Sequence, residues 1–583
     1  MLTSPAGRYA AAAVIPTRGT VDVMRASLPG TGVAQVSTAT HSRCVPVPGA
    51  APRPGRGEVS KLPGMEAIVD TVALVTISVL GAALARRFGM IAPLVLLVAG
   101  LGLSFVPGVP EVHLEPELVL LGILPPLLYV AALRTSVPAF KDALRPILLL
   151  AVGLVVVSAF AVGAVVHLLL PEVPFAACLA LGAVVAPPDA VSATAVARRV
   201  GLPRRVVTIL DGESLLNDAS ALVLLRISVG ALLGTAAGVW EIAGQVVLKG
   251  GGGLLIGLVA AFCAAWLHRR IEDPLLDDAL SVLTPFVVVI VAEQLHTSSV
   301  VAVVVAGLYL GHRIPYLLSA TSRLQMEAVW RLLTFLLEGV VFLLVGLQLR
   351  ELVAGLETSP ATTAAVTGAV FATVVVVRFA WMYPATYLAR LVPRVRAREQ
   401  RPPAAVPAVV AWAGMRGVVT LAAALTLTAY PSLPGELFVF VAFAVIVLTL
   451  LVHGTTLPWL SRRLGVVEDT SAQDALAEAG VQHAASRAAL AALEDKADGA
   501  PPAVVERLRA LTDSRANVAW ERLGNQAQET PSAAYGRLRR EMIAAERHVF
   551  KVARNEGRIP EEVLTRAQRE LDLEESQLTR SDE

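Results

Sequence analysis

Apolar segments about as long as a membrane is thick follow one another from Met65 to about residue 463. Short polar loops separate these segments, so the pattern predicts about thirteen membrane-spanning helices. The predicted spans are 66–85, 90–107, 117–133, 146–170, 174–197, 206–231, 240–268, 274–295, 298–311, 327–349, 361–389, 405–428 and 435–460. We therefore expect an all-α polytopic membrane protein whose transmembrane domain covers residues 65–463.

The regions on either side of this domain lack the pattern. Residues 1–64 are rich in Ala, Pro, Gly, Ser and Arg, which predicts a disordered N-terminal extension. The segment M-E-A-I-V-D at Met65 is compatible with a translation start there, in which case the extension is not translated. Residues 464–583 are rich in Ala, Glu, Arg, Leu and Gln with helical periodicity, which predicts a cytoplasmic helical tail. We interpret this tail as a hairpin or coiled coil that supports folding or dimerisation, with a regulatory sensor as the alternative.

Composition and charge agree with a membrane protein. Only 16% of the residues are charged and the mean hydropathy is +0.65, whereas soluble proteins carry about 25% charged residues. A net charge of +2 gives no indication of nucleic-acid binding. The three cysteines are scattered singly, and no nucleophile–base pair or nucleotide-binding loop is present, so we predict neither a cofactor nor an enzyme activity.

The basic residues predict the orientation in the membrane. In the predicted topology the loops on the side of the C-terminus carry nearly all of the Lys and Arg residues in loops. The loops on the opposite side carry only Arg350. Because basic loops stay in the cytoplasm, we expect a multi-pass protein of the cell membrane with a cytoplasmic C-terminus.

The sixth span contains a cluster of polar residues, L-D-G-E-S-L-L-N-D-A-S-A at 210–221. Asp211, Ser214 and Asp218 share one helical face, and Glu213 and Asn217 form an adjacent stripe. A charge at this depth costs at least about 2.5–3.5 kcal/mol, so each carboxylate needs a partner, water or a bound ion. The first face therefore predicts a site for a small cation or a proton, and Glu213 requires a cation from another span.

Two further spans carry residues that break a helix at mid-membrane. Pro187 and Pro188 precede Asp189 in the fifth span, and Gly414 and Gly417 flank Arg416 in the twelfth. Interrupted helices at membrane depth line cavities, and transporters use them as ion sites. Their positions also fit two inverted repeats with broken crossing helices.

Two further charged residues lie at membrane depth in other spans. Arg378 in the eleventh span is the candidate partner of Glu213. Glu338 in the tenth span fits equally well an ion-access funnel or a structural hydrogen bond. Arg416, Asp211 and Pro188 are, like Glu338, candidates for the ion pathway or for the structural core.

These motifs resemble the monovalent cation:proton antiporters, in the branch that holds the bacterial NhaP-type sodium/proton antiporters and the animal sodium/proton exchangers. The resemblance covers about 66–462 and rests on G-E-S-L-L-N-D-A at 212–219, P-P-D-A at 187–190, L-P-P-L-L-Y at 124–129 and G-M-R-G at 414–417. It implies a homodimer of thirteen-helix chains in the lipid bilayer. In each chain a core domain, spans four to six and eleven to thirteen, would move against a dimer domain in an elevator-like cycle.

The resemblance also implies roles for individual residues. Asp218 matches the family's ion-binding aspartate, Asn217 its neighbouring asparagine and Ser214 a site hydroxyl, while Glu213 matches the glutamate that pairs with Arg378. The ion-binding residues are expected to be Asp218, Asn217, Ser214 and Asp189, and of these Asp218, Ser214 and Asp189 would be the ligands of transported Na⁺. Pro188 stands where the family often has Thr, so one side-chain ligand is lost and backbone carbonyls would have to replace it.

The function expected from these residues is exchange of Na⁺, or of K⁺ or Li⁺, for H⁺. A buried carboxylate can bind a proton or a cation but not both, and with the neutral Asn217 beside it the exchange is expected to be electroneutral and 1:1. The rival functions are a secondary carrier of organic anions, with arginines as ligands, and a membrane sensor that acts through its tail.

Overall fold

The computed structural model describes residues 63–107, 109, 114–234, 239–393, 396, 401–431, 433–467, 471–521 and 529–582. The predicted disordered extension therefore lies outside the described residues, apart from its last two positions, which begin the first helix. Within these ranges all regular structure is helical and no strand occurs, in agreement with the predicted all-α class.

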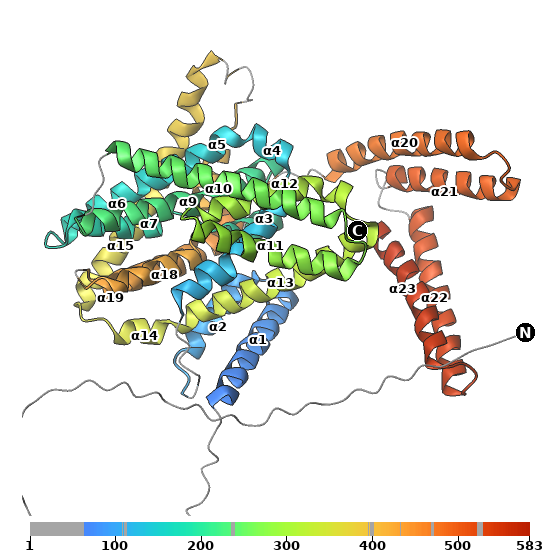
Figure 1. Ribbon diagram of the computed structural model, residues 1–583, viewed down its shortest axis with the longest axis horizontal. Helices are drawn as coiled ribbons and strands as arrows, with labels where there is room; N and C mark the ends of the chain where they lie inside the picture. Colours follow the sequence, from blue (N-terminus) through green and yellow to red (C-terminus); the bar gives the residue numbers. More distant parts are fainter. Residues whose placement is uncertain are drawn as a thin grey trace, which may run out of the picture. The chain divides into compact units, whose positions relative to one another are not determined.

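Each predicted span contains helical structure (Figure 1). The elements up to the first interruption are α1 (Pro63–Arg87), α2 (Ala92–Leu103), η1 (Leu118–Ile123), α3 (Leu124–Arg134), α4 (Val137–Asp142), α5 (Leu144–Leu148), η2 (Leu149–Leu154), α6 (Val155–Leu169) and α7 (Phe175–Val185). Next come α8 (Ala190–Val200), α9 (Arg204–Leu232), α10 (Val239–His268), α11 (Pro274–Gln294), α12 (Ser299–Leu317), α13 (Ala320–Leu347), α14 (Leu349–Ala354) and α15 (Pro360–Tyr387). The last elements of this domain are η3 (Leu388–Leu391), α17 (Ala405–Trp412), α18 (Val418–Leu425), η4 (Thr426–Ala429) and α19 (Gly435–Arg463).

In the described residues, eight helical segments are long and apolar enough to cross a membrane, which supports a multi-pass membrane protein. They are Leu144–Leu169, Arg204–Leu232, Gly244–His268, Pro274–Gln294, Ser299–Leu317, Ala320–Ala354, Pro360–Tyr387 and Gly435–Arg463. Four shorter apolar segments accompany them: Ala92–Leu103, Leu118–Arg134, Phe175–Val185 and Val418–Ala429. The total of thirteen crossings stays a prediction, since helix breaks shorten several of the predicted spans below membrane length.

The proline pair of the third span shows how such a break arises. Pro125 and Pro126 have no N–H to donate to the carbonyls of Leu121 and Gly122, so a regular α-helix cannot pass through them. The chain instead forms the π-helical turn η1 and starts α3 at Leu124, which places both prolines in the first turn, where a missing N–H costs little.

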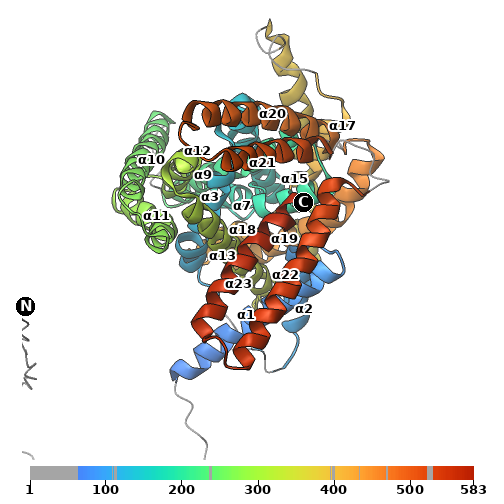
Figure 2. The same cartoon turned by 90° about the vertical axis from the view of Figure 1, so that its right-hand side faces the viewer.

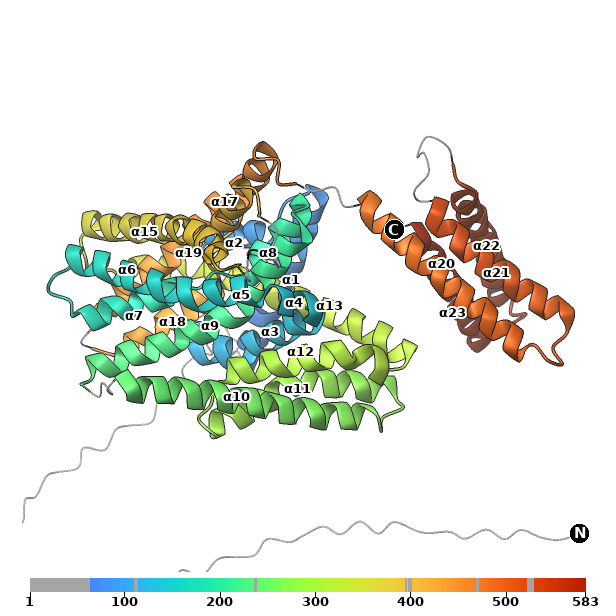
Figure 3. The same cartoon turned by 90° about the horizontal axis from the view of Figure 1, so that it is seen from above.

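Two hydrophobic clusters hold the membrane helices together. One gathers buried residues of α6, α7, α9, α15 and α17–α19, together with α2 and the second half of α13. The other gathers α3, α10, α11, α12 and the first half of α13, and Figure 3 shows α10, α11 and α12 side by side along one edge. The boundary between the clusters thus runs through α13, whereas the resemblance assigns all of that span to the dimer domain.

The C-terminal region forms two helical hairpins (Figure 2). Helix α20 (Ser471–Lys496) packs on α21 (Pro502–Glu521), and α22 (Pro531–Asn555) packs on α23 (Glu561–Asp582). Arg539 on α22 donates two hydrogen bonds to Glu574 on α23, which hold the pKa of that carboxyl below its usual range.

Candidate ion-binding site

The two interrupted spans meet each other. Helix α7 ends at Val185 and α8 begins at Ala190, while α17 ends at Trp412 and α18 begins at Val418. Pro187 and Pro188 cannot donate to Ala183 and Val184, so the first helix has to stop here. The backbone N–H of Asp189 donates a 2.7 Å hydrogen bond to the carbonyl of Met415, which joins the two non-helical segments directly.

Arg416 satisfies the carbonyl groups that these helix ends leave free. Its side chain is 1% exposed, and it donates to the carbonyls of Val185 at 3.0 Å and Ala186 at 3.1 Å as well as to the carbonyl of Gly414. The C-terminal ends of α7 and α17 carry partial negative charge, which stabilises a guanidinium buried between them. Arg416, for which the sequence left a pathway or a core role open, therefore holds the crossing together.

Asp189 occupies the opposite side of the crossing, where the two outgoing helices begin. Its carboxylate is the N-cap of α8 and accepts a 2.9 Å hydrogen bond from the N–H of Ser192. It also lies against Gly417, where a Cβ would come within 2.5 Å of the Asp189 Cγ atom. A carboxylate beside two helix N-termini is partly compensated by their dipoles, without an arginine.

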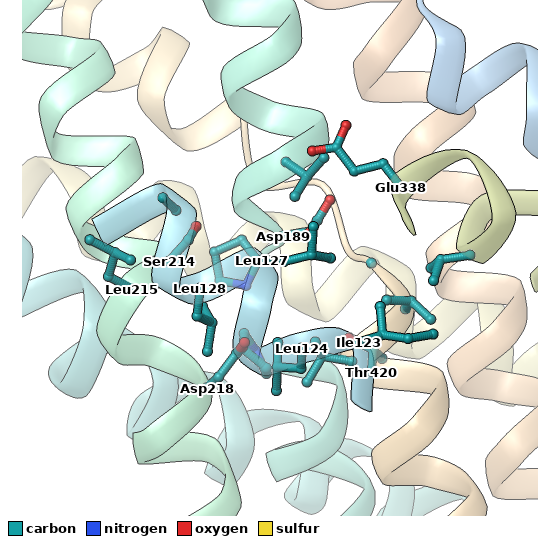
Figure 4. A pocket seen from close by; sticks show the side chains of 18 of the residues that line it. Ile123, Leu124, Leu127, Leu128, Asp189, Ser214, Leu215, Asp218, Glu338 and Thr420 are labelled. Atoms are coloured by element: carbon teal, nitrogen blue, oxygen red, sulfur yellow. The ribbon is translucent and has the colours of Figure 1, made fainter. Parts of the chain in front are cut away.

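A cavity of about 60 Å³ lies beside this crossing. Its polar lining comes from Asp189, Ser214, Asp218, Glu338 and Thr420 (Figure 4). Its apolar lining includes Ile123, Leu124, Leu127, Leu128, Ala131, Val191, Leu215, Val341, Phe342, Val418 and Val419. A volume of this size holds a small ion with one or a few waters.

The charges around the cavity have one sign. Asp189, Asp218 and Glu338 line it, and no arginine or lysine is among the described lining residues. Asp218 is 7% exposed, and it shares the cavity with the carboxylate of Asp189. Such an oxygen-rich, cation-free cavity attracts a proton or a small metal cation, whose preferred ligands are carboxylate, hydroxyl and carbonyl oxygens.

Asn217 lies behind the cavity wall and is not among the lining residues. Its amide group is fully buried, and its Nδ2 atom donates a 2.6 Å hydrogen bond to the carbonyl of Pro188. This bond ties α9 to the interrupted segment, and it occupies one of the backbone oxygens that the sequence offered as replacement ligands. The Oδ1 atom of Asn217 is buried without a hydrogen-bond partner among the described residues, so it can still accept a bond.

The structure places Glu213 and Arg378 in direct contact. Arg378 Nη1 and Nη2 donate to the two Glu213 carboxylate oxygens at 2.6 and 2.8 Å, and the side chains are 1–2% exposed. The guanidinium also donates to the carbonyl of Val410 at 3.3 and 3.4 Å. This pair connects α9, α15 and α17, and both of its charges are satisfied.

Asp211 does not join the cavity, although its spacing places it on the same helical face as Asp218. Its carboxylate instead accepts hydrogen bonds from Thr194 Oγ1 at 2.5 Å and from Arg198 Nη2 at 3.2 Å. Seven residues of helix separate the two aspartates by about 10 Å along the axis, so a shared face is not a shared site. Asp211 ties α8 to α9.

Two further residues line the cavity beside those that the sequence assigned to the ion site. Glu338 lines the cavity from α13, which favours the access funnel over a structural hydrogen bond. Thr420, in the first turn of α18, also lines the cavity and had not been singled out, although it lies one turn after Arg416 in the second interrupted span.

Known proteins resemble this chain in sequence and in fold. The family model described as "Sodium/hydrogen exchanger, transmembrane" matches residues 74–463. An uncharacterized Na(+)/H(+) exchanger of Mycobacterium tuberculosis is 36% identical over 530 residues, which is 88% of this chain and 96% of that protein. The Na(+)/H(+) antiporter ApNhaP of Aphanothece halophytica is 31% identical over 428 residues, which is 72% of this chain and 78% of that protein.

Two further comparisons concern a curated antiporter and a solved structure. A sodium, potassium, lithium and rubidium/H(+) antiporter of Bacillus pumilus is 29% identical over 412 residues, which is 67% of this chain and 61% of that protein. The structure of the sodium proton antiporter MjNhaP1 from Methanocaldococcus jannaschii superposes with a TM-score of 0.55 at 16% identity, over 69% of this chain and all of that chain. The chain therefore belongs to the sodium/hydrogen exchanger family, and it is a multi-pass membrane protein of the monovalent cation:proton antiporters.

Proposed function

We propose that this protein exchanges Na⁺ for H⁺ across the cell membrane and that Asp218 is the group that carries either ion. The observation that supports this proposal is the cavity between the crossing and α3, in which Asp218 faces other oxygen groups and no cation. Ser214, Asp189 and backbone oxygens complete the ligand set for Na⁺ once the cavity closes around it.

Exchange follows from competition for one carboxylate. Charged Asp218 is costly at membrane depth, whereas Asp218 with a proton or with Na⁺ is neutral. A site that changes sides readily only when it is neutral couples the movement of one ion to the return of the other. Binding of either ion thus shifts the population toward the state that can change sides.

The position of the cavity supports elevator-like movement. Asp218, Asp189 and Thr420 belong to the predicted core domain, while Leu124 on α3 and Glu338 on α13 belong to the predicted dimer domain. The ion site therefore lies where the two domains would slide past each other, and α3 forms the largely apolar wall against which the core moves.

We propose an electroneutral 1:1 stoichiometry because the charges next to Asp218 on α9 and at the crossing are compensated. Glu213 is neutralised by Arg378, Asn217 is uncharged, and Asp189 lies at two helix N-termini. Only Asp218 then alternates between two occupied states of equal charge.

We further propose that two chains form a homodimer in the lipid bilayer, with the C-terminal hairpins in the cytoplasm. The arginine-rich loops support this orientation. Crosslinking in membranes tests the assembly, and protease access to the C-terminal hairpins in everted vesicles tests the side on which they lie.

The two rival functions fit the cavity less well. A carrier of organic anions needs basic residues at its substrate site, and the described lining of this cavity holds three acids instead. A sensor that acts through its tail needs no cavity at the helix crossing. Family membership favours cation exchange over both.

The proposal is tested in everted vesicles from a host that lacks its own antiporters, with a dye that reports the proton gradient. Addition of Na⁺ should dissipate the gradient, and Li⁺ and K⁺ added in turn measure the cation range. Valinomycin with K⁺ on both sides should leave the Na⁺ response unchanged if exchange is electroneutral. Absence of a response to every cation in vesicles that contain the protein would contradict the proposed function.

A further inference from the structure

A second and larger cavity, of about 550 Å³, lies at the end of the membrane domain where α9 begins and α15 and α19 end. Five parts of the chain enclose it: α5 with η2, the first turns of α9, the last turns of α15, the segment 401–410, and residues 464–467 after α19. Its volume lies in the range typical of pockets for small organic ligands, of roughly 300–1,000 Å³. The ion site described above uses none of its lining residues.

The charged residues among the described lining of this cavity are arginines. Arg145, Arg205 and Arg401 line it from three different elements, and no Asp or Glu is among the described lining residues. Arg401 is stacked over the ring of Tyr387, whose hydroxyl donates a 3.1 Å hydrogen bond to the carbonyl of Pro402 and fixes this segment to α15. Helices α9 and α17 both begin at the cavity without a side-chain cap, so their partial positive charge adds to that of the arginines.

The remainder of the cavity is apolar. Leu149, Leu150, Val206, Ile209, Met382, Val406, Val410, Leu464, Val466 and Val467 line it. Leu464 and Val467 stay 38% and 41% exposed, so the apolar lining continues onto the surface of the membrane domain. A polar solute such as inorganic phosphate would leave this lining unused, whereas a headgroup with an attached acyl chain would use both parts.

The floor of this cavity lies next to the buried ion pair. Ile209 is one turn from Glu213 on α9, and Met382 is one turn from Arg378 on α15. Val410, which also lines the cavity, accepts the hydrogen bonds of Arg378 through its carbonyl. A ligand in the cavity would therefore contact all three helices that the Glu213–Arg378 pair connects.

We propose that this cavity binds an anionic amphiphile, with its phosphate or carboxylate headgroup at Arg145, Arg205 and Arg401 and its acyl chain against the apolar floor. The ligand comes from the membrane as an anionic phospholipid or from solution as a fatty acid. By bridging α9, α15 and α17 it stabilises the helices that carry Asp218 and the crossing. This inference does not depend on the identity of the exchanged cation.

The experiment measures ligand binding to the purified full-length protein in nonionic detergent by native mass spectrometry and by thermal shift. The probes are phosphatidylglycerol, phosphatidylcholine with the same acyl chains, oleate and inorganic phosphate. Phosphatidylglycerol should bind and raise the melting temperature, whereas phosphatidylcholine and inorganic phosphate should not. Binding of oleate as well identifies any singly charged amphiphile as a ligand, and failure of oleate identifies the phospholipid as the source.

Matched variants locate the binding. Because each arginine near an anionic lipid contributes about a factor of five, R205Q/R401Q should weaken phosphatidylglycerol binding by about tenfold or more. The control R204Q/R462Q removes the same charge from exposed arginines at the same end that do not line the cavity, and it should bind as the unsubstituted protein does. Ala385→Trp, which places an indole ring in the cavity and keeps all three arginines, should also weaken binding.

Three results would overturn the proposal. If R205Q/R401Q and R204Q/R462Q lost phosphatidylglycerol binding equally, the binding would depend on the general surface charge and not on this cavity. A response to inorganic phosphate equal to that for phosphatidylglycerol would remove the role of the acyl chain. The third result concerns Glu468 and Asp469, the acids that follow Val467 in the sequence. If phosphatidylglycerol bound only to the variant E468Q/D469N and not to the unsubstituted protein, the chain's own carboxylates would be the partners of the arginines in place of a lipid.

Discussion

Glu213 and Asp218 lie five residues apart on α9, and both are more than nine-tenths buried. Glu213 meets Arg378 in a bidentate pair, whereas Asp218 meets a cavity lined by two further acids. Five residues rotate a side chain by about 140° around a helix, so the two carboxylates face different neighbours. Glu213 faces α15, and Asp218 faces α3.

The difference shows how one helix can carry both a structural and a transport function. A buried charge with a fixed partner stabilises one arrangement of helices. Its charge is already compensated, so it does not need to bind an ion. A buried charge without a fixed partner is stable only while a mobile partner is present, which is the requirement for an exchange site. The account therefore predicts opposite responses to neutralisation of the two carboxylates.

The largest effect is expected for Asp218→Asn, which should abolish cation-dependent proton movement in vesicles while expression and melting temperature stay near normal. An amide cannot alternate between a protonated and a cation-bound state. Asp211→Asn is the matched control, because it makes the same chemical change two turns away in a partly exposed pair with Arg198 worth at most about 1 kcal/mol. Equal loss of transport in both variants would show that the carboxylate in the cavity is no more important for transport than another carboxylate of α9.

The next largest effect concerns stability. Glu213→Ala and Arg378→Ala should each destabilise the protein by about 3–5 kcal/mol, because each leaves the other charge buried and alone. Melting in detergent measures the loss, and Arg226→Ala, which removes an exposed arginine of the same helix, should change little. The double variant E213A/R378A should lose less stability than the sum of the two single losses, and strict additivity of the single effects would show that the two side chains do not interact.

A smaller effect is expected at the helix crossing. Gly417→Ala places a Cβ within 2.5 Å of the Asp189 side chain, so one of the two must move, at a cost of about 1–3 kcal/mol and with slower exchange. Gly368→Ala on α15 is the control, because no heavy atom lies within 4 Å of its Cβ position and alanine favours a helix. Exchange by the Gly417 variant at the normal rate would show that the contact with Asp189 is unimportant for transport.

The sequence predicted the helical class and the positions of the helices well, because long apolar runs leave few alternatives to a membrane helix. It also predicted both interruptions, since Pro187 with Pro188 and Gly414 with Gly417 act through local backbone chemistry. It assigned Arg378 to Glu213 because two buried charges of opposite sign need each other and because the family pairs them.

What the sequence could not provide were contacts that depend on packing between distant segments. Helical spacing placed Asp211 with Asp218, but it could not show that Thr194 and Arg198 bind Asp211 first. It placed Asn217 beside Asp218 in the ion site, but it could not show that the Asn217 amide donates to the carbonyl of Pro188. It also could not show that Arg416 donates to the carbonyls of Val185 and Ala186, because this contact depends on how the two interrupted spans pack against each other.

The most direct test of the central claim measures protons released when Na⁺ binds to the purified protein in weakly buffered detergent solution, with choline chloride as the salt control. If Na⁺ and H⁺ compete for Asp218, Na⁺ should release up to about one proton per chain from the unsubstituted protein. Asp218→Asn should release none, and Asp211→Asn should release as much as the unsubstituted protein. Proton release that persists undiminished in the Asp218 variant, or its absence from the unsubstituted protein, would contradict the account.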